Sequence, residues 1–298
     1  MLFFFLLCRQ LVLVTRRCPL TSHAHEALES KAKHDHEQRQ IEMQFPKNSK
    51  GLMNPELRRR GIFLLPNALT TAALFAGFYA IVQAMNGRFE VSAVAIFAAM
   101  VLDGLDGRVA RLTRTQSAFG AEYDSLSDMV SFGAAPALVV YEYVLKGLGN
   151  FGWAAAFIYC ACAALRLARF NTNIGIVDKR YFQGMPSPAA AALVAGLVWL
   201  IHDLNIPVND IRIPAAVLTI FAGVTMVSNI RFYSGKEFNP RRSVPFFAVA
   251  AIALGFALIS FYPPGVLFAV FLIYAMSGYV LTFIQWRALR KSKANPIA

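Results

Sequence analysis

The chain has 298 residues, of which 57% are hydrophobic and 15% are charged, and its mean hydropathy is +0.48. This composition is too apolar for an ordinary soluble domain and indicates an integral membrane protein. The net charge is +12. The basic residues gather on one side of the expected membrane helices, so we attribute this charge to membrane topology and expect no nucleic-acid partner.

The first 53 residues differ in character from the rest of the chain. Residues 1–14 are apolar but interrupted at Arg9, and they lack the basic segment that precedes the apolar core of a secretory signal. Residues 21–50 carry four of the five histidines, which would allow a metal-binding tail, but their mixed charge favours a solvated, disordered extension. Met53 would serve as a cytoplasmic start, so we expect the stretch that precedes it in the extension, residues 1–53, to be dispensable or to be an over-extended start of the reading frame.

Apolar windows close to the ~20 residues that cross a bilayer recur along the rest of the chain. We therefore predict an all-α integral membrane protein with about eight transmembrane helices. The expected helices are 62–85, 91–112, 121–145, 151–171, 187–203, 211–230, 244–262 and 265–287. We expect residues 54–235 to form the catalytic membrane domain, and residues 236–298 to add two packing helices and a basic tail.

Lysine and arginine are distributed very unequally between the two sides of this helix order. Eighteen of the 29 Lys and Arg residues fall on one side, and only Arg88, Lys146 and Arg212 fall on the other. Because short cytoplasmic loops accumulate basic residues, we predict that both ends of the helical region face the cytoplasm. The basic side would then face an anionic leaflet, which attracts such residues.

Four aspartates lie in the second and third expected helices. They are Asp103, Asp106, Asp124 and Asp128. The first two are three residues apart and the last two four apart, so each pair shares one helical face. A charged side chain at the bilayer centre costs roughly 2.5–3.5 kcal/mol, so these acids need a cation or a water-filled cavity. Oxygen ligands without nearby histidine or cysteine suit Mg²⁺ or Mn²⁺, and a pair of such ions is a common device in phosphoryl chemistry.

Small and basic residues accompany the aspartates. Gly107 and Ala110 lie on the same side of the second expected helix as the acids and would let a ligand approach the backbone closely. Gly120 would allow a sharp re-entry into the third expected helix. Arg111 and Arg114 could bind phosphate oxygens.

Two other interpretations of the acids stay open. They could cap helices at the cytoplasmic rim and pair with Arg108, Arg111 and Arg114. They could also form the ion path of a cation transporter, although transporters tend to place ionisable groups near the bilayer midplane, in paired repeats. In this chain the acids gather toward one membrane face, and we find no internal repeat.

The acids also carry a family resemblance. The spacing Asp-x2-Asp-Gly-x2-Ala-Arg-x8-Gly-x3-Asp-x3-Asp, which runs from Asp103 to Asp128, resembles without substitution the signature of the CDP-alcohol phosphatidyltransferases. The similarity extends from about residue 60 to residue 235. It implies a helical-bundle enzyme that tends to be a homodimer, in which Asp103, Asp106 and Asp124 hold a pair of metal ions. Asp128 would help to hold one metal and act as the general base.

The resemblance further implies that Gly107, Ala110 and Arg111 bind the cytidine diphosphate group. Asn67, Thr70, Arg114 and Gly120 are further candidates for this site. Asn67 and Thr70 belong to the segment Pro-Asn-Ala-Leu-Thr, which is similar to the family segment that lines the nucleotide pocket. Thr70 could equally be a residue near a helix start that bonds its own backbone.

Three further stretches, 124–136, 164–171 and 182–190, most resemble the phosphatidylserine synthases of the family. They imply transfer of a phosphatidyl group from CDP-diacylglycerol to L-serine at the cytoplasmic face of a bacterial inner membrane, among membrane lipids. Glycerol 3-phosphate or inositol remains an alternative acceptor.

Five residues in these stretches are candidates for binding serine or a phosphate. They are Arg166, Arg169, Asn171, Gln183 and Ser187. The two arginines could equally be positive-inside anchors, and the other three could have loop or capping roles.

Overall fold

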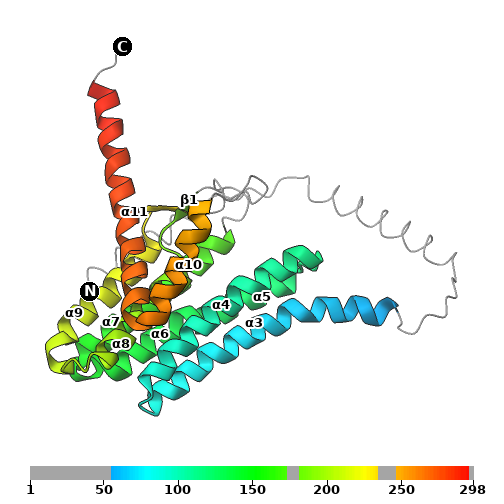
Figure 1. Ribbon diagram of the computed structural model, residues 1–298, viewed down its shortest axis with the longest axis horizontal. Helices are drawn as coiled ribbons and strands as arrows, with labels where there is room; N and C mark the ends of the chain where they lie inside the picture. Colours follow the sequence, from blue (N-terminus) through cyan, green and yellow to red (C-terminus); the bar gives the residue numbers. More distant parts are fainter. Residues whose placement is uncertain (1–54, 173–180, 234–245, 295–298) are drawn as a thin grey trace, which may run out of the picture. The chain divides into compact units, whose positions relative to one another are not determined.

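The structure is a computed structural model that describes residues 55–172, 181–233 and 246–294 (Figure 1). The predicted extension, residues 1–53, lies outside the described residues. From Pro55 onward the chain forms one compact unit, which is built almost entirely of helices. The α-helices are α3 (Pro55–Met85), α4 (Phe89–Thr113), α5 (Ala118–Asp128), α6 (Ala135–Tyr143), α7 (Asn150–Thr172), α8 (Ser187–Asp203), α9 (Val208–Val227), α10 (Phe246–Phe261) and α11 (Pro263–Ala294).

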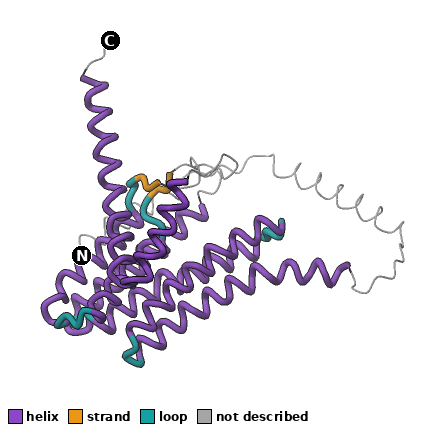
Figure 2. The backbone as a smooth tube through the Cα atoms, viewed as in Figure 1, coloured by secondary structure: helices purple, strands orange, loops and turns teal. Residues whose placement is uncertain are grey.

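Shorter elements complete the described part of the fold. A π-helix, Met129–Ala134, joins α5 to α6, and a 3-10 helix, Leu145–Leu148, precedes α7. Two short antiparallel strands, β1 (Tyr181–Gln183) and β2 (Arg231–Tyr233), pair with Phe182 opposite Phe232. This ribbon, orange in Figure 2, was not predicted from the sequence, and it joins the segment after α7 to the segment after α9.

The predicted helical membrane class is confirmed. Four helical stretches in the described residues are long and apolar enough to cross a membrane: Leu65–Met85, Asn150–Thr172, Val208–Val227 and Pro263–Ile284. The shorter helix α8 is also apolar. Helices occupy all of the expected positions, but a total of eight membrane crossings stays a prediction.

The first and third predicted helices differ most clearly from those in the structure. The first helix begins at Pro55 rather than at residue 62, so Pro66 lies inside α3 and not near its start. The third is not one regular α-helix, because the π-helix Met129–Ala134 interrupts it. The sequence shows no simple signal for this interruption, since π-helices are single-turn insertions within α-helices.

The most buried helix of the described unit is α8. It packs against α4, α6, α9 and α11, and its residues Ala189–Val198 are all buried. Small side chains let the neighbouring helices approach closely. At Gly196, a Cβ atom would lie 3.2 Å from the Cα atom of Phe268 in α11, so the two helices almost touch there.

The turn between α4 and α5 brings the two aspartate-bearing helix faces together. Helix α4 ends where Arg114 adopts a left-handed conformation with a φ of 54°, and the Thr115 N–H donates to the Ala110 carbonyl at 3.0 Å. Helix α5 then starts with Ser117, whose Oγ accepts a hydrogen bond from the Gly120 N–H at 3.0 Å. Gly120 therefore lies inside α5, and the prediction that it makes the sharp turn was wrong.

The helix that carries the last aspartate is fastened to α3 by serine side chains. Ser127 Oγ donates to the Thr70 carbonyl at 3.2 Å, and Ser131 Oγ donates to the Ala73 carbonyl at 3.1 Å. A Cβ atom at Gly77 would lie 2.5 Å from Ser131 Oγ. The missing side chain at Gly77 thus permits the close approach of α3 to the π-helix.

Candidate active site

Three carboxylates converge where α4 meets α5. The side chains of Asp103, Asp106 and Asp124 each offer an oxygen that lies within 4.8 Å of the others. Asp106 is buried, with 4% of its surface exposed, and the other two are half-buried. Like charges this close repel strongly outside bulk water, so the cluster favours a bound cation.

Asp128 lies beside this cluster. Its carboxyl group is close enough to that of Asp103 for a side-chain hydrogen bond, and it interacts electrostatically with Arg166 of α7. Asp128 therefore lies next to Asp103, at the edge of the cluster.

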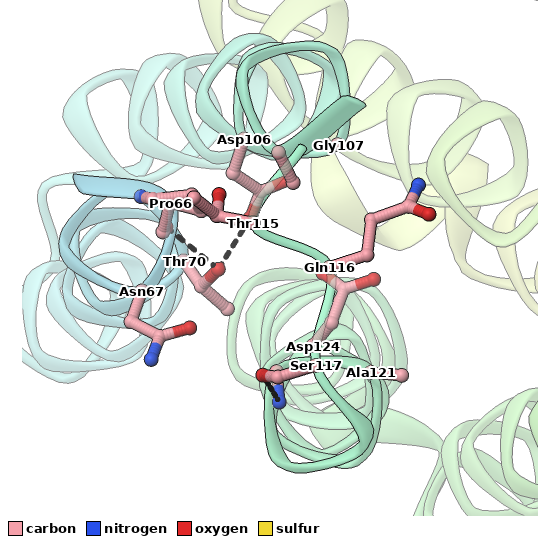
Figure 3. A pocket seen from close by; sticks show the side chains of 12 residues that line it. Pro66, Asn67, Thr70, Asp106, Gly107, Thr115, Gln116, Ser117, Ala121 and Asp124 are labelled. Atoms are coloured by element: carbon pink, nitrogen blue, oxygen red, sulfur yellow. Dashed lines mark hydrogen bonds between the residues drawn. The ribbon is translucent and has the colours of Figure 1, made fainter. Parts of the chain in front are cut away.

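Thr70 links α3 to the cluster. Its Oγ1 lies 2.6 Å from Asp106 Oδ2, to which it donates, and 3.1 Å from the Pro66 carbonyl (Figure 3). The bond to its own helix backbone was one of the two alternatives for Thr70, and the contact with Asp106 was not predicted. Thr70 is 4% exposed, so its hydrogen bond to the Asp106 carboxylate is shielded from bulk water.

A cavity of about 300 Å³ opens beside the carboxylates between α3, α4 and α5. Figure 3 shows Asp106 on α4 and Asp124 on α5 at its wall, with Asn67 and Thr70 contributed by α3. The lining residues are Pro66, Asn67, Thr70, Asp106, Gly107, Ala110, Thr115, Gln116, Ser117, Gly120, Ala121 and Asp124. Two members of the carboxylate cluster therefore belong to the cavity wall.

The two glycines in the wall act differently. A Cβ atom at Gly107 would have no atom within 4 Å, so this backbone is open to a ligand. A Cβ atom at Gly120 would lie 3.1 Å from Ser117 Oγ and 3.4 Å from Asn67 Oδ1. A side chain at this position would narrow the part of the cavity between α3 and α5.

Arg111 and Arg114 do not line the cavity in this conformation. Both side chains are exposed, and the Arg111 Nε donates to the Gly107 carbonyl at 2.9 Å. Within the residues that the structure describes, the one ion pair shorter than 4.0 Å is Lys146–Glu142. The alternative in which the aspartates pair with neighbouring arginines therefore finds no support in the geometry.

The carboxylate cluster fits a divalent cation. In the described part of the chain, Asp124 Oδ1 is buried and has no hydrogen-bond partner. Leaving a buried carboxylate oxygen without a partner is costly, and an ion would satisfy it. The donors at this cluster are all carboxylate oxygens, which suits a hard cation.

The predicted acceptor residues form pairs at the same end of the bundle. Arg166 Nη1 donates to Ser187 Oγ at 2.6 Å, and Arg169 Nη2 donates to Gln183 Oε1 at 3.0 Å. Asn171 Nδ2 donates to Ser125 Oγ at 3.0 Å. These pairs join the last part of α7 to the start of α8, to strand β1 and to α5. The Arg166 Nε is buried without a partner among the described residues.

Sequence reasoning missed several of the residues that shape the site. Cavity-lining residues that were not predicted are Thr115, Gln116, Ser117 and Ala121. Ser117 had a usable signal, because serine is a favoured first residue before a helix. Gln116 had none, since it lies in the unspecified gap between Arg111 and Gly120 of the signature.

Comparison with known proteins gives a consistent result. The family model for CDP-alcohol phosphatidyltransferase matches residues 63–228. A protein from Helicobacter pylori named CDP-diacylglycerol–serine O-phosphatidyltransferase is 40% identical over 176 residues, which is 59% of this chain and 74% of the relative. A protein of the same name from Methanocaldococcus jannaschii is 37% identical over 187 residues, or 62% of this chain and 81% of the relative. A third, from Mycobacterium tuberculosis strain H37Rv, is 43% identical over 149 residues, 48% of this chain and 52% of the relative.

Proposed function

The chain belongs to the CDP-alcohol phosphatidyltransferase family, and from this premise we propose that it transfers a phosphatidyl group from CDP-diacylglycerol to L-serine and releases CMP. One observation carries the chemistry: Asp106 and Asp124 belong both to the carboxylate cluster and to the wall of the cavity. A diphosphate seated in the cavity would therefore lie against groups suited to metal-assisted phosphoryl transfer. The choice of serine is supported by the similarity to relatives named for that acceptor.

Asp103, Asp106, Asp124 and Asp128 would hold two ions of Mg²⁺ or Mn²⁺. Bound there, the ions would neutralise the charge of the diphosphate and stabilise the phosphate oxygen that leaves with CMP. Thr70 keeps Asp106 turned toward the cluster, so the ligand set is held in place before substrate arrives.

In the proposed reaction the serine hydroxyl oxygen attacks the phosphorus that carries the diacylglycerol. A new oxygen–phosphorus bond forms, and the bond from this phosphorus to the bridging oxygen breaks, so that CMP leaves with the bonding electrons. Asp128 accepts the proton of the serine hydroxyl, as a general base within reach of the acceptor. No covalent phosphatidyl-enzyme is required, because the acceptor itself is the nucleophile.

The cavity wall would bind the cytidine diphosphate group. Gly107 exposes its backbone, and Asn67, Ala110 and Gly120 complete the nearby wall. Arg111 and Arg114 stand outside the wall and would reach the phosphates by changing rotamer, since both are exposed. Such a movement would allow a bidentate contact between guanidinium and phosphate.

Arg166, Arg169, Asn171, Gln183 and Ser187 would form the acceptor side of the site. The buried Nε of Arg166, which lacks a partner in the described residues, is suited to bind the serine carboxylate or a lipid phosphate. The electrostatic interaction between Arg166 and Asp128 supports placing the acceptor near the general base.

The protein is an integral membrane protein, and we propose that the active site faces the cytoplasm of a bacterial inner membrane. The excess of Lys and Arg on the side of the aspartate cluster supports this orientation. Acyl chains would enter laterally from the lipid, while the nucleotide stays in the polar cavity. We also propose a homodimer, which mass measurement of the purified protein in native lipid discs would test.

Release of CMP tests the proposed reaction. The purified protein in detergent would be given Mn²⁺ or Mg²⁺ and CDP-diacylglycerol. CMP release would then be compared among samples that contain serine, glycerol 3-phosphate, inositol or no acceptor. We expect release that depends on serine and stops with a chelator. Release of CMP with another alcohol would show that serine is not the acceptor. No release with any acceptor would refute the transferase activity and favour the alternative of a cation transporter.

A further inference from the structure

The loop that leads into α8 is fixed tightly to the end of α9. The Gly184 N–H donates to the Ile230 carbonyl at 2.8 Å, and the Met185 N–H donates to the Thr225 carbonyl at 3.1 Å. Gly184 has a φ of +79°, and a Cβ atom there would overlap the Met226 carbonyl. The loop can therefore lie this close to α9 only with glycine at this position.

Helix α11 holds the same region from the other side. Phe232 of β2 is fully buried and lies against Gly278 of α11, where a Cβ atom would overlap the phenyl ring. The ring also packs against Tyr274, one turn earlier, with ring centroids 5.5 Å apart. The side chain of Phe232 thus fits into a hollow in α11 that a larger residue would fill.

A hydrogen bond joins α11 to the end of α9. The hydroxyls of Tyr279 and Thr225 lie 2.7 Å apart, and the Tyr279 ring stacks on Phe221 with centroids 5.4 Å apart. Thr225 is the residue whose carbonyl accepts from Met185. Helix α11 therefore contacts both partners of the loop that leads into α8: the end of α9 and strand β2.

Acceptor-side residues flank this loop. Gln183 ends β1 and binds Arg169, and Ser187 begins α8 and binds Arg166. Arg169 Nη1 also donates to the Val227 carbonyl at the end of α9, at 3.0 Å. The positions of both arginine partners consequently depend on the ribbon and on the end of α9, which α11 holds in place.

We propose that α11 is the element that positions the acceptor side of the active site, through the contact of Phe232 with Gly278 and the hydrogen bond of Tyr279 with Thr225. This inference rests on the proposed function. It assigns a catalytic support role to a helix that lies beyond the residues matched by the family model, 63–228. The residues involved are positioning residues, since they act through Arg166 and Arg169.

The geometry separates this effect from the nucleotide side. The cavity is lined by residues of α3, α4, α5 and the turn between α4 and α5, whereas α11 packs mainly on α8, α10 and β2. A disturbed contact of α11 with β2 or with the end of α9 should therefore impair use of the acceptor and leave CDP-diacylglycerol binding unchanged.

Two variants test the proposal. Tyr279→Phe removes only the hydroxyl that binds Thr225, and Gly278→Ala pushes against the Phe232 ring. We expect each to raise the KM for serine roughly three- to tenfold, the effect of losing about one hydrogen bond, with the KM for CDP-diacylglycerol unchanged. The matched control is Gly196→Ala, which disturbs the packing of α8 on α11 at Phe268 away from the ribbon and should leave both KM values unchanged.

The measurements are initial rates of CMP release over a range of each substrate, with a thermal unfolding curve for every variant. Equal changes in both KM values, or an unchanged serine KM in Tyr279→Phe, would overturn the proposal even if stability falls. The wild-type protein is assayed first with serine. Failure at that step would refute the proposed acceptor, whereas failure confined to the variants' predicted KM change would refute the role of α11 alone.

Discussion

Thr70 on α3 donates a hydrogen bond of 2.6 Å to Asp106 on α4, between residues 36 positions apart in the sequence. The carbonyl of the same threonine accepts from Ser127 on α5. One residue thus ties together the three helices that surround the cavity. Because a carboxylate that binds a metal needs a fixed orientation, this contact should matter for metal binding.

Thr70→Val should leave the Asp106 carboxylate less firmly oriented. It should therefore raise the divalent metal concentration needed for half-maximal activity. The expected rise is roughly tenfold, the lower end of what loss of an outer contact to a metal ligand costs. A titration of CMP release against Mn²⁺ measures it. The control is Thr71→Val, because the Thr71 hydroxyl is exposed and bonds the Asn67 carbonyl and Tyr123. An equal effect in both variants would contradict a specific role for Thr70.

Replacing a site carboxylate should abolish turnover without unfolding the protein. Asp124→Asn removes charge from the cluster, and Asp128→Asn removes the proposed base, so each should lower the rate at least about 100-fold. The thermal unfolding midpoint should be retained or should rise in metal-free buffer, because the repulsion among the carboxylates falls. Normal turnover in either variant would contradict the mechanism.

A divalent cation should stabilise the folded protein in the absence of any substrate. Binding to the native state alone raises stability in proportion to the logarithm of ligand concentration. We expect Mn²⁺ to raise the unfolding temperature of the wild-type protein and a chelator to reverse the rise. Asp124→Asn should show a much smaller shift, since Asp124 offers one of the clustered oxygens. An identical shift in this variant would place the metal elsewhere.

Much of the site could be predicted because its information is local. The spacings between Asp103 and Asp106 and between Asp124 and Asp128 place each pair on one helical face, whatever the rest of the fold does. Convergence of the two faces required only a tight turn between α4 and α5. The structure brings three of these acids together, which the spacing alone could indicate but not measure.

The missing features depend on contacts between distant segments. Thr70 and Asp106 were both predicted as site residues, but the hydrogen bond between them was not, because nothing in either helix encodes their relative rotation. The π-helix has no compositional signal, and β1 and β2 have only three residues each, too few for a pattern of alternating side chains. The role of Phe232 follows only from where α11 passes, which local propensity does not determine.

Tyr159→Phe should destabilise the protein and slow the reaction. The Tyr159 hydroxyl on α7 is fully buried and donates to the Phe132 carbonyl of the π-helix at 3.0 Å. Without the hydroxyl the buried Phe132 carbonyl loses this hydrogen bond, at a cost of roughly 1 kcal/mol. The π-helix follows Asp128 directly, so we expect kcat to fall more than either KM changes. Tyr123→Phe is the control, since Tyr123 bonds Thr71 at an exposed position. An unchanged kcat would show that the π-helix does not position Asp128.

Arg169→Ala should raise the serine requirement more than the CDP-diacylglycerol requirement. Arg169 joins Gln183 to the end of α9 through two hydrogen bonds of 3.0 Å, and its loss would release the loop that precedes Ser187. Bonds made by a charged donor contribute about 1.5–3 kcal/mol, so the serine KM should rise roughly tenfold or more. Arg108→Ala removes an exposed arginine at the same end of the bundle and controls for the loss of positive charge at the membrane surface. If both variants raised the two KM values equally, the effect of Arg169 would be electrostatic attraction of substrates to the surface, and the acceptor side would have to be sought elsewhere in the fold.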